Sequence, residues 1–226
     1  MMNWVESARR GGFTKIERLT IPGPSGGLES ILEYDPAHEP LMTAVVCHPH
    51  PLYGGTLHNK VVFRIARAAR EAGLPTLRFN FRGVGKSAGV HDNGVGERDD
   101  VRAALDFLRA RFPHLPSTVA GFSFGSWVGL LVGAEDLRVA ALVGLGLPVT
   151  DTDFSFLYSV TKPKLIVQGT RDQYGHREDL QAVFDKLAEP KQIHWVENAE
   201  HFFTGKLEEV RNVIHAFLSN VVQRLP

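Results

Sequence analysis

The sequence contains only one cysteine, Cys47, among its 226 residues. A single cysteine excludes a disulfide within the chain and fits a reducing compartment, so we expect a cytoplasmic protein. No apolar run reaches the roughly 18 residues of a membrane-spanning helix, and residues 1–6 lack the profile of a signal peptide. Neither charge sign is in excess, because 25 Lys and Arg balance 25 Asp and Glu. We therefore expect no membrane partner and no nucleic-acid partner.

The overall composition is that of an ordinary globular protein, with 43% hydrophobic and 22% charged residues. A chain of this length buries about 70% of its unfolded surface, so its core needs no disulfide or metal for stability. No linker, repeat or low-complexity tract interrupts the sequence. We expect residues 1–226 to form a single domain without a cofactor.

Strand and helix patterns alternate along the chain. Two β-type runs, residues 14–21 and 28–34, flank a turn rich in Pro and Gly and predict an antiparallel hairpin. The following alternation predicts an α/β fold: a mostly parallel sheet of about eight strands with helices on both faces. Further strands are expected at residues 43–47, 76–81, 118–121, 139–145, 164–168 and 192–196, and helices at residues 59–72, 97–111, 127–133, 177–187 and 207–222.

The loop after the predicted strand 118–121 contains the pattern G-x-S-x-G, with Ser123 at its centre and glycines at positions 121 and 125. Between a strand and a helix, this pattern is typical of a sharp turn that raises a nucleophilic serine above the sheet. The alternative is a glycine-bounded turn with an incidental serine. Ser126 lacks the flanking glycines and is predicted to be a polar residue of the helix's first turn.

A nucleophilic serine needs a base, and the base needs an acid that orients it. Asp172 follows the strand 164–168 and His201 follows the strand 192–196, so the order Ser, Asp, His agrees with this type of turn. We predict Ser123, Asp172 and His201 as the catalytic residues. The rivals are Asp151 and Asp153 for the acid, and His176 and His194 for the base.

The loop after the strand 43–47 is expected to help stabilise the oxyanion. One N–H donor is predicted at Phe124, directly after the serine. Pro49 and Pro51 have no N–H, which leaves a residue of this loop as the second donor. The candidates are His50, Leu52 and Tyr53, with Leu52 slightly favoured.

Three other kinds of chemistry are considered and not favoured. The His48–x–His50 pair, even with His58, lacks a clear third zinc ligand. Cys47 is expected to end a buried strand rather than to act as a nucleophile. Residues 80–87 resemble a phosphate-binding loop, but Asn80 replaces the required glycine, so we expect a tight loop beside the active site.

Taken together, these motifs resemble the α/β-hydrolase superfamily, and more narrowly its compact bacterial members. The resemblance rests on His48-Pro49-His50-Pro51, on residues 80–87, on the turn around Ser123 and on His201-Phe202-Phe203. It implies a serine hydrolase mechanism on Ser123, Asp172 and His201. Many members have His-Gly where this chain has His48-Pro49, so the second oxyanion donor is not assigned by the resemblance.

The predicted function is therefore hydrolysis of carboxylic esters of small molecules. A non-catalytic binding protein on the same scaffold remains open, as does an amidase, thioesterase or lactone hydrolase with the same residues. The short interval 146–163 leaves no room for a large cap domain, which predicts a shallow site and short acyl groups. A homodimer that extends the groove stays open. Candidates for the acyl side, or alternatively for the core, are Phe154, Phe156, Leu157 and Tyr158.

Overall fold

The structure is a computed structural model that describes residues 14–225. The expectation for residues 1–6 lies outside this range.

Strands and helices alternate from the third strand onward, as the sequence predicts. The strands are β1 Lys15–Gly23, β2 Gly26–Tyr34, β3 Thr43–Cys47, β4 Thr76–Phe79, β5 Ser117–Phe122, β6 Val139–Leu145, β7 Lys164–Gly169 and β8 Lys191–Val196. The α-helices are α1 Lys60–Glu71, α2 Gly96–Arg111, α3 Phe124–Glu135, α4 Arg177–Lys186 and α5 Leu207–Val222, and two short 3₁₀ helices are η1 Pro51–Tyr53 and η2 Ser155–Leu157.

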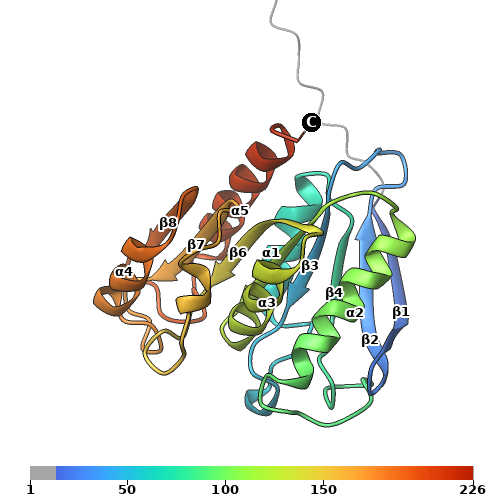
Figure 1. Ribbon diagram of the computed structural model, residues 1–226, viewed down its shortest axis with the longest axis horizontal. Coiled ribbons are helices and arrows are strands. Elements are labelled where there is room, and N and C mark those ends of the chain that lie inside the picture. The colour runs from blue at the N-terminus through green and yellow to red at the C-terminus, as the bar shows by residue number, and fades with distance from the viewer. Residues whose placement is uncertain (1–13, 226) are drawn as a thin grey trace, which may run out of the picture.

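All eight strands form one sheet in the order β1-β2-β4-β3-β5-β6-β7-β8. Strands β1 and β2 pair antiparallel, and so do β2 and β4, whereas the remaining neighbours are parallel. The sheet runs across the molecule with β1 and β8 at its two edges (Figure 1). The prediction of a mostly parallel sheet with an antiparallel hairpin at the front is confirmed.

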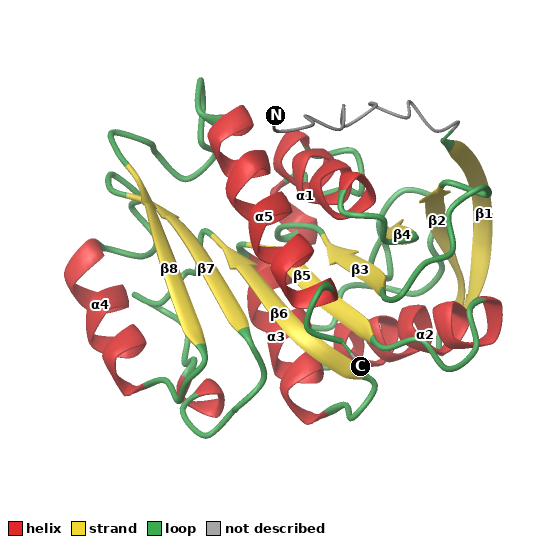
Figure 2. Cartoon of the chain, turned by 90° about the horizontal axis from the view of Figure 1, so that it is seen from above, coloured by secondary structure: helices red, strands yellow, loops and turns green. Residues whose placement is uncertain are grey.

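Helices cover both faces of the sheet. Figure 2 shows α1 and α5 on one face and α2, α3 and α4 on the other. Two separate groups of buried apolar side chains correspond to these layers, one beneath α2 and α3 and one beneath α1 and α5. The predicted apolar stripe of α1, which includes Val62, Ile65 and Ala69, is buried against the sheet. Strand β3 is buried at every position, as a strand covered on both faces should be.

The topology determines where the site lies. Strand β3 lies between β4 and β5. The chain therefore places the strand after β3 on one side of it and the next strand, β5, on its other side, so the strand order reverses at β3. At such a reversal the loops after the two adjacent strands diverge and leave a crevice at their carboxyl ends. The pair Cys47–Gly121 ends the β3–β5 register and brings the loop 48–59 beside Ser123.

Three local details differ from the expectations. The hairpin strands continue through Pro22 and Gly27, so the turn contains only residues 24 and 25. Strand β4 ends at Phe79, two residues early. Helix α3 begins at Phe124, three residues before the predicted start, because Ser123 accepts the N–H groups of Ser126 and Trp127 at its carbonyl.

The interval between β6 and β7 contains only loop segments and η2 and forms no cap domain, as predicted. Within residues 14–225, none of the helices combines the length and the hydrophobicity needed to cross a membrane.

Candidate active site

Ser123 occupies a strained position between β5 and α3. Its φ is 56° and its ψ is −123°, a conformation that costs a non-glycine residue about 1–3 kcal/mol. The flanking glycines make this turn sterically allowed. A Cβ at position 121 would lie 2.2 Å from the Gly125 carbonyl oxygen, and one at position 125 would lie 2.4 Å from that of His48. The serine itself is half-buried at the carboxyl edge of the sheet.

Asp172 and His201 meet at the ends of β7 and β8. The Nδ1 atom of His201 lies 2.8 Å from Oδ2 of Asp172, and both side chains are buried. A carboxylate only accepts hydrogen bonds, so Nδ1 carries the proton and Nε2 is left as a base. The His201 ring lies 4.8 Å from the ring of Phe122, the residue before the serine. The structure thus gathers all three predicted residues at one edge of the sheet.

Gln168 contacts the candidate acid and is not among the residues that the sequence predicted for the site. This buried side chain is the penultimate residue of β7, and its Nε2 donates to Oδ2 of Asp172 at 3.0 Å. Its Oε1 accepts the N–H of Leu147 at 2.8 Å. The N–H of Tyr174 donates to the other oxygen of Asp172 at 2.9 Å. The only sequence signal for Gln168 is a polar residue near the end of an otherwise apolar strand.

The rival acids and bases lie in other surroundings. Asp153 is exposed and accepts the N–H of Ser155, and Asp151 is also exposed. His194 faces Glu209 from the middle of β8, with Nε2 3.0 Å from Oε1. His176 is the exposed N-terminal cap of α4. None of these four side chains is hydrogen-bonded to Asp172 or His201.

The hydrogen bonds of the loop after β3 separate the three candidates for the second oxyanion donor. The N–H of Leu52 donates to Nδ1 of His50 at 3.2 Å, and the N–H of Tyr53 donates to the His50 carbonyl at 3.1 Å. Both are therefore used within η1, which argues against the preference for Leu52. Among the described residues, the N–H groups of His50 and Phe124 have no acceptor. The two residues are neighbours, because their rings lie 4.9 Å apart.

His48 fastens this loop to the adjacent one. Its Nδ1 donates to the Pro49 carbonyl at 2.6 Å, and its Nε2 accepts the N–H of Phe81 at 3.0 Å. Burial lowers the pKa of His48 to about 4, so the ring is neutral at pH 7. Both ring nitrogens are thus used for structure. Within residues 14–225, no three His, Cys, Asp or Glu side chains are grouped to hold a metal ion.

Cys47 and the loop 80–87 both have structural roles. Cys47 is completely buried, and burial raises the pKa of its thiol, which keeps the thiol protonated. The loop 80–87 is closed by the carboxylate of Glu29, which accepts the N–H of Lys86 at 2.9 Å and Nδ2 of Asn80 at 2.8 Å. The loop is therefore closed by the carboxylate of Glu29, a residue of β2. This is expected of a tight packing loop and not of a phosphate-binding site.

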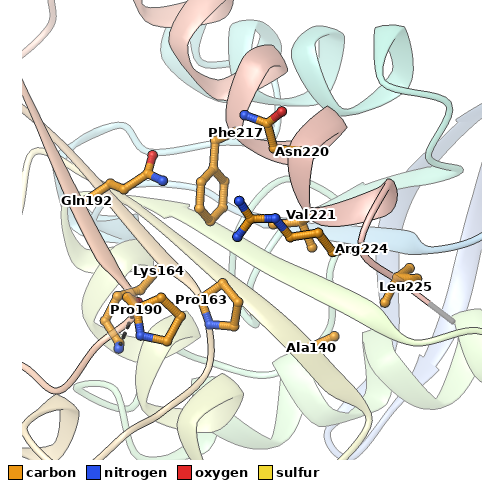
Figure 3. Close-up of a pocket in the computed structure, with 10 residues that line it drawn as sticks. All are labelled: Ala140, Pro163, Lys164, Pro190, Gln192, Phe217, Asn220, Val221, Arg224 and Leu225. Carbon is orange, nitrogen blue, oxygen red and sulfur yellow. Dashed lines mark hydrogen bonds between the residues drawn. The ribbon is translucent and has the colours of Figure 1, made fainter.

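The aromatic stretch after β6 contributes mainly to the core. Phe154 and Leu157 are buried there, and Phe156 and Tyr158 are partly buried against the same side chains. A pocket of about 160 Å³ lies at the opposite, amino ends of β6, β7 and β8, between Phe217 of α5 and Pro163 (Figure 3). It is lined by none of the candidate catalytic residues.

Comparisons with known proteins agree with this architecture. A family model described as an alpha/beta hydrolase domain matches residues 53–223. An uncharacterized protein of Rickettsia prowazekii is 36% identical over 217 residues, which cover 91% of this chain and 90% of that protein. The structure of an α/β serine hydrolase without a lid from Xanthomonas campestris is 35% identical, with a TM-score of 0.85, and the match covers 94% of this chain and 97% of that one. The structure of an alpha-beta serine hydrolase homologue from Coxiella burnetii is 40% identical, with a TM-score of 0.83, and the match covers 88% and 96%.

Proposed function

Because the chain belongs to the alpha/beta hydrolase family, we propose that it is a serine hydrolase that cleaves carboxylic esters of small molecules. The observation that carries this proposal is the 2.8 Å contact between His201 and Asp172 at the same sheet edge as the strained turn of Ser123. A serine with positive φ between two glycines is costly to maintain, and an exposed nucleophile is the physical reason for such a turn.

In the proposed reaction, the Ser123 hydroxyl attacks the acyl carbon while Nε2 of His201 takes its proton. Asp172 holds the proton on Nδ1 and stabilises the imidazolium that forms. The proton then passes from Nε2 to the departing alcohol oxygen, which leaves an acyl-enzyme on Ser123. Water, deprotonated by the same imidazole, releases the carboxylic acid and regenerates the serine.

The oxyanion of each tetrahedral intermediate is stabilised by the N–H groups of Phe124 and His50. Phe124 is the first residue of α3, so its N–H belongs to the positive end of a helix dipole. His50 supplies the second donor because η1 uses the N–H groups of Leu52 and Tyr53. One such donor is typically worth about 10²–10³ in rate.

A fluorophosphonate probe tests the proposal, because it labels a serine only when the serine is activated as a nucleophile. We expect labelling of the wild-type protein and none of Ser123→Ala. Ser126→Ala is the matched control, since this neighbouring serine uses its hydroxyl to donate to the Ser123 carbonyl at 2.6 Å. No labelling of folded wild-type protein, or equal labelling of Ser123→Ala, would contradict the proposal.

Nitrophenyl esters, thioesters, amides and lactones of the same acyl group then distinguish the bond that is cleaved. We expect the ester to have the highest kcat/KM relative to its uncatalysed hydrolysis. A larger acceleration for a thioester or an amide would reassign the substrate class while retaining the same catalytic residues.

A further inference from the structure

Exposed apolar side chains gather around the candidate site. Ten large hydrophobic side chains are exposed among the described residues, and six of them lie on loops at the carboxyl edge of the sheet. They come from four separate loops, which follow β3, β4, β7 and β8. Single exposed apolar residues are normal on a protein surface, whereas a group at one edge points to a binding role. The six are Leu52, Tyr53, Val90, Val95, Tyr174 and Phe202.

Two of these side chains flank the proposed base. The ring of Tyr174 lies 4.6 Å from that of His201, and the ring of Phe202 lies 5.3 Å from it, both steeply inclined to the imidazole. His201 itself is only 3% exposed, whereas Tyr174 is 46% and Phe202 is 41% exposed. Each ring therefore covers the imidazole and still presents apolar surface to solvent.

The chemistry indicates which part of an ester meets this surface. Nδ1 of His201 is occupied by Asp172, so only Nε2 can pass a proton to the departing alcohol. The alcohol oxygen must therefore lie beside Nε2, while the carbonyl oxygen points to the N–H groups of Phe124 and His50. The substituent on the alcohol oxygen consequently extends along the His201 side of the site, where the two exposed rings lie.

We propose that the alcohol part of the substrate is a neutral aromatic group that packs against Tyr174 and Phe202. This inference rests on the proposed function and adds the substrate class to it. Aromatic pairs contribute beyond their buried area, and rings with two side-chain torsions lose little entropy when they become ordered. Tyr174 is also held in place, because its N–H donates to Asp172.

Exposed aromatic rings also bind cationic alcohols such as choline, but the charges here disfavour them. The Nζ of Lys60 already lies 5.9 Å from the centre of the Phe202 ring. A second cation on that ring would meet a like charge. The neighbouring carboxylate of Glu200 is used by the N–H groups of Phe202 and Thr204. A neutral aryl group is therefore the occupant that fits.

The test compares kcat/KM for benzyl acetate, cyclohexylmethyl acetate and ethyl acetate. The acyl group is constant, and all three are esters of primary alcohols. We expect benzyl acetate to be preferred over ethyl acetate by about tenfold, and over cyclohexylmethyl acetate by about threefold. Equal values for the benzyl and ethyl esters would overturn the inference. A cyclohexylmethyl value equal to the benzyl value would overturn the requirement for an aromatic group.

Variants distinguish recognition of the alcohol from mere shielding of His201. Tyr174→Ser and Phe202→Ser should each reduce the benzyl-to-ethyl ratio by about threefold or more, whereas Tyr174→Phe should retain it. Leu137→Ser is the matched control, because Leu137 is 97% exposed in the turn between α3 and β6, away from this edge. A uniform loss for both esters, with the ratio unchanged, would mean that the rings only shield the imidazole.

Failure of this inference can be separated from failure of the proposed function. Fluorophosphonate labelling of Ser123 without any benzyl preference would contradict the inference alone. Absence of labelling would contradict the proposed function.

Saturation-transfer NMR of benzyl acetate with Ser123→Ala provides a readout without turnover. We expect Ser123→Ala to show a saturation-transfer signal for benzyl acetate, and we expect this signal to be weaker when Phe202→Ser is added to Ser123→Ala. An equal signal for the two proteins would contradict the inference.

Discussion

At the scale of single residues, the candidate site depends on how hydrogen bonds are shared among buried groups. The carboxylate of Asp172 accepts from His201, Gln168 and Tyr174, so the proposed acid is held in one position by three donors. Buried polar groups that keep all their partners hold one geometry, whereas those that lose one incur the full desolvation penalty. Small changes at these residues should therefore have large effects.

Asp172→Asn should lower kcat by about 10⁴, because the asparagine amide favours the imidazole tautomer that lacks a basic Nε2. The measurement is kcat on a short nitrophenyl ester, with circular dichroism to confirm folding. Asp153→Asn is the matched control and should leave kcat nearly unchanged, since Asp153 is exposed and only accepts from Ser155. The assignment of the acid is wrong if Asp153→Asn is the inactive variant.

His48 should make the protein less stable as the pH falls. Burial lowers the pKa of its ring to about 4, against about 6.5 for an exposed histidine. Between these values the unfolded state binds more protons than the folded state. The free energy of unfolding therefore decreases from pH 6.5 towards pH 4, by up to about 3 kcal/mol, and is fully retained above pH 6.5.

His48→Gln tests this pH dependence, because a glutamine amide can both donate and accept a hydrogen bond but does not titrate. Urea unfolding at several pH values should give a shallower decline for His48→Gln than for the wild type between pH 6.5 and 4. Both proteins retain the other titrating groups, including His50, whose pKa burial also lowers. Parallel curves for the two proteins would contradict the role assigned to His48.

At the scale of elements, the turn from β5 to α3 couples Ser123, the proposed nucleophile, to the neighbouring strand. Gly125 approaches the end of β3 so closely that a Cβ there would lie 2.4 Å from the His48 carbonyl oxygen and 2.5 Å from that of Cys47. These are backbone atoms, which cannot move aside as a flexible side chain can. The close approach of the first turn of α3 to the end of β3 thus requires a glycine at position 125.

Gly125→Ala should therefore destabilise the protein by about 1–3 kcal/mol and should also lower kcat, because α3 must shift away from β3. Thermal or urea unfolding and an ester assay measure the two effects. Gly129→Ala, one turn later on the same helix, is the matched control. Its Cβ would come no closer than 3.1 Å to side-chain atoms, and alanine favours helix, so we expect a change below about 1 kcal/mol.

At the scale of the whole molecule, the absence of a cap leaves the site open at the carboxyl edge of the sheet. The stretch between β6 and β7 turns inward, and Phe154 and Leu157 are buried in the core rather than placed over Ser123. A long acyl chain would therefore lie on an open surface rather than in an enclosed groove, and each methylene left in water forgoes about 0.8 kcal/mol.

Acyl groups of about two to six carbons should accordingly be preferred over long chains, measured as kcat/KM across a series of nitrophenyl esters. A steady rise out to long chains would contradict the open site and favour a groove extended by a second copy of the chain. Measurement of the molecular mass in solution by light scattering would then distinguish a dimer from a monomer.

The sequence by itself determined the order and type of the elements and the three candidate catalytic positions. The spacing of apolar residues is a local property of the sequence. The apolar stripe of α1 and the uninterrupted apolar run of β3 could therefore be identified from neighbouring residues alone. Ser123, Asp172 and His201 were found because each follows a strand, and parallel strands bring their carboxyl ends to one edge.

Only the tertiary structure decided which polar groups are already paired. The sequence slightly favoured Leu52 over His50 as the second oxyanion donor, but η1 uses the N–H of Leu52 and leaves that of His50 available. Gln168 gave almost no sequence signal, because its partners Leu147 and Gly175 come from two different loops. Phe154 and Tyr174 are both aromatic loop residues, yet one is buried and the other is exposed. Hydrogen-bond partners and exposure depend on residues distant in the chain, so they are defined only once the sheet and its helices have assembled.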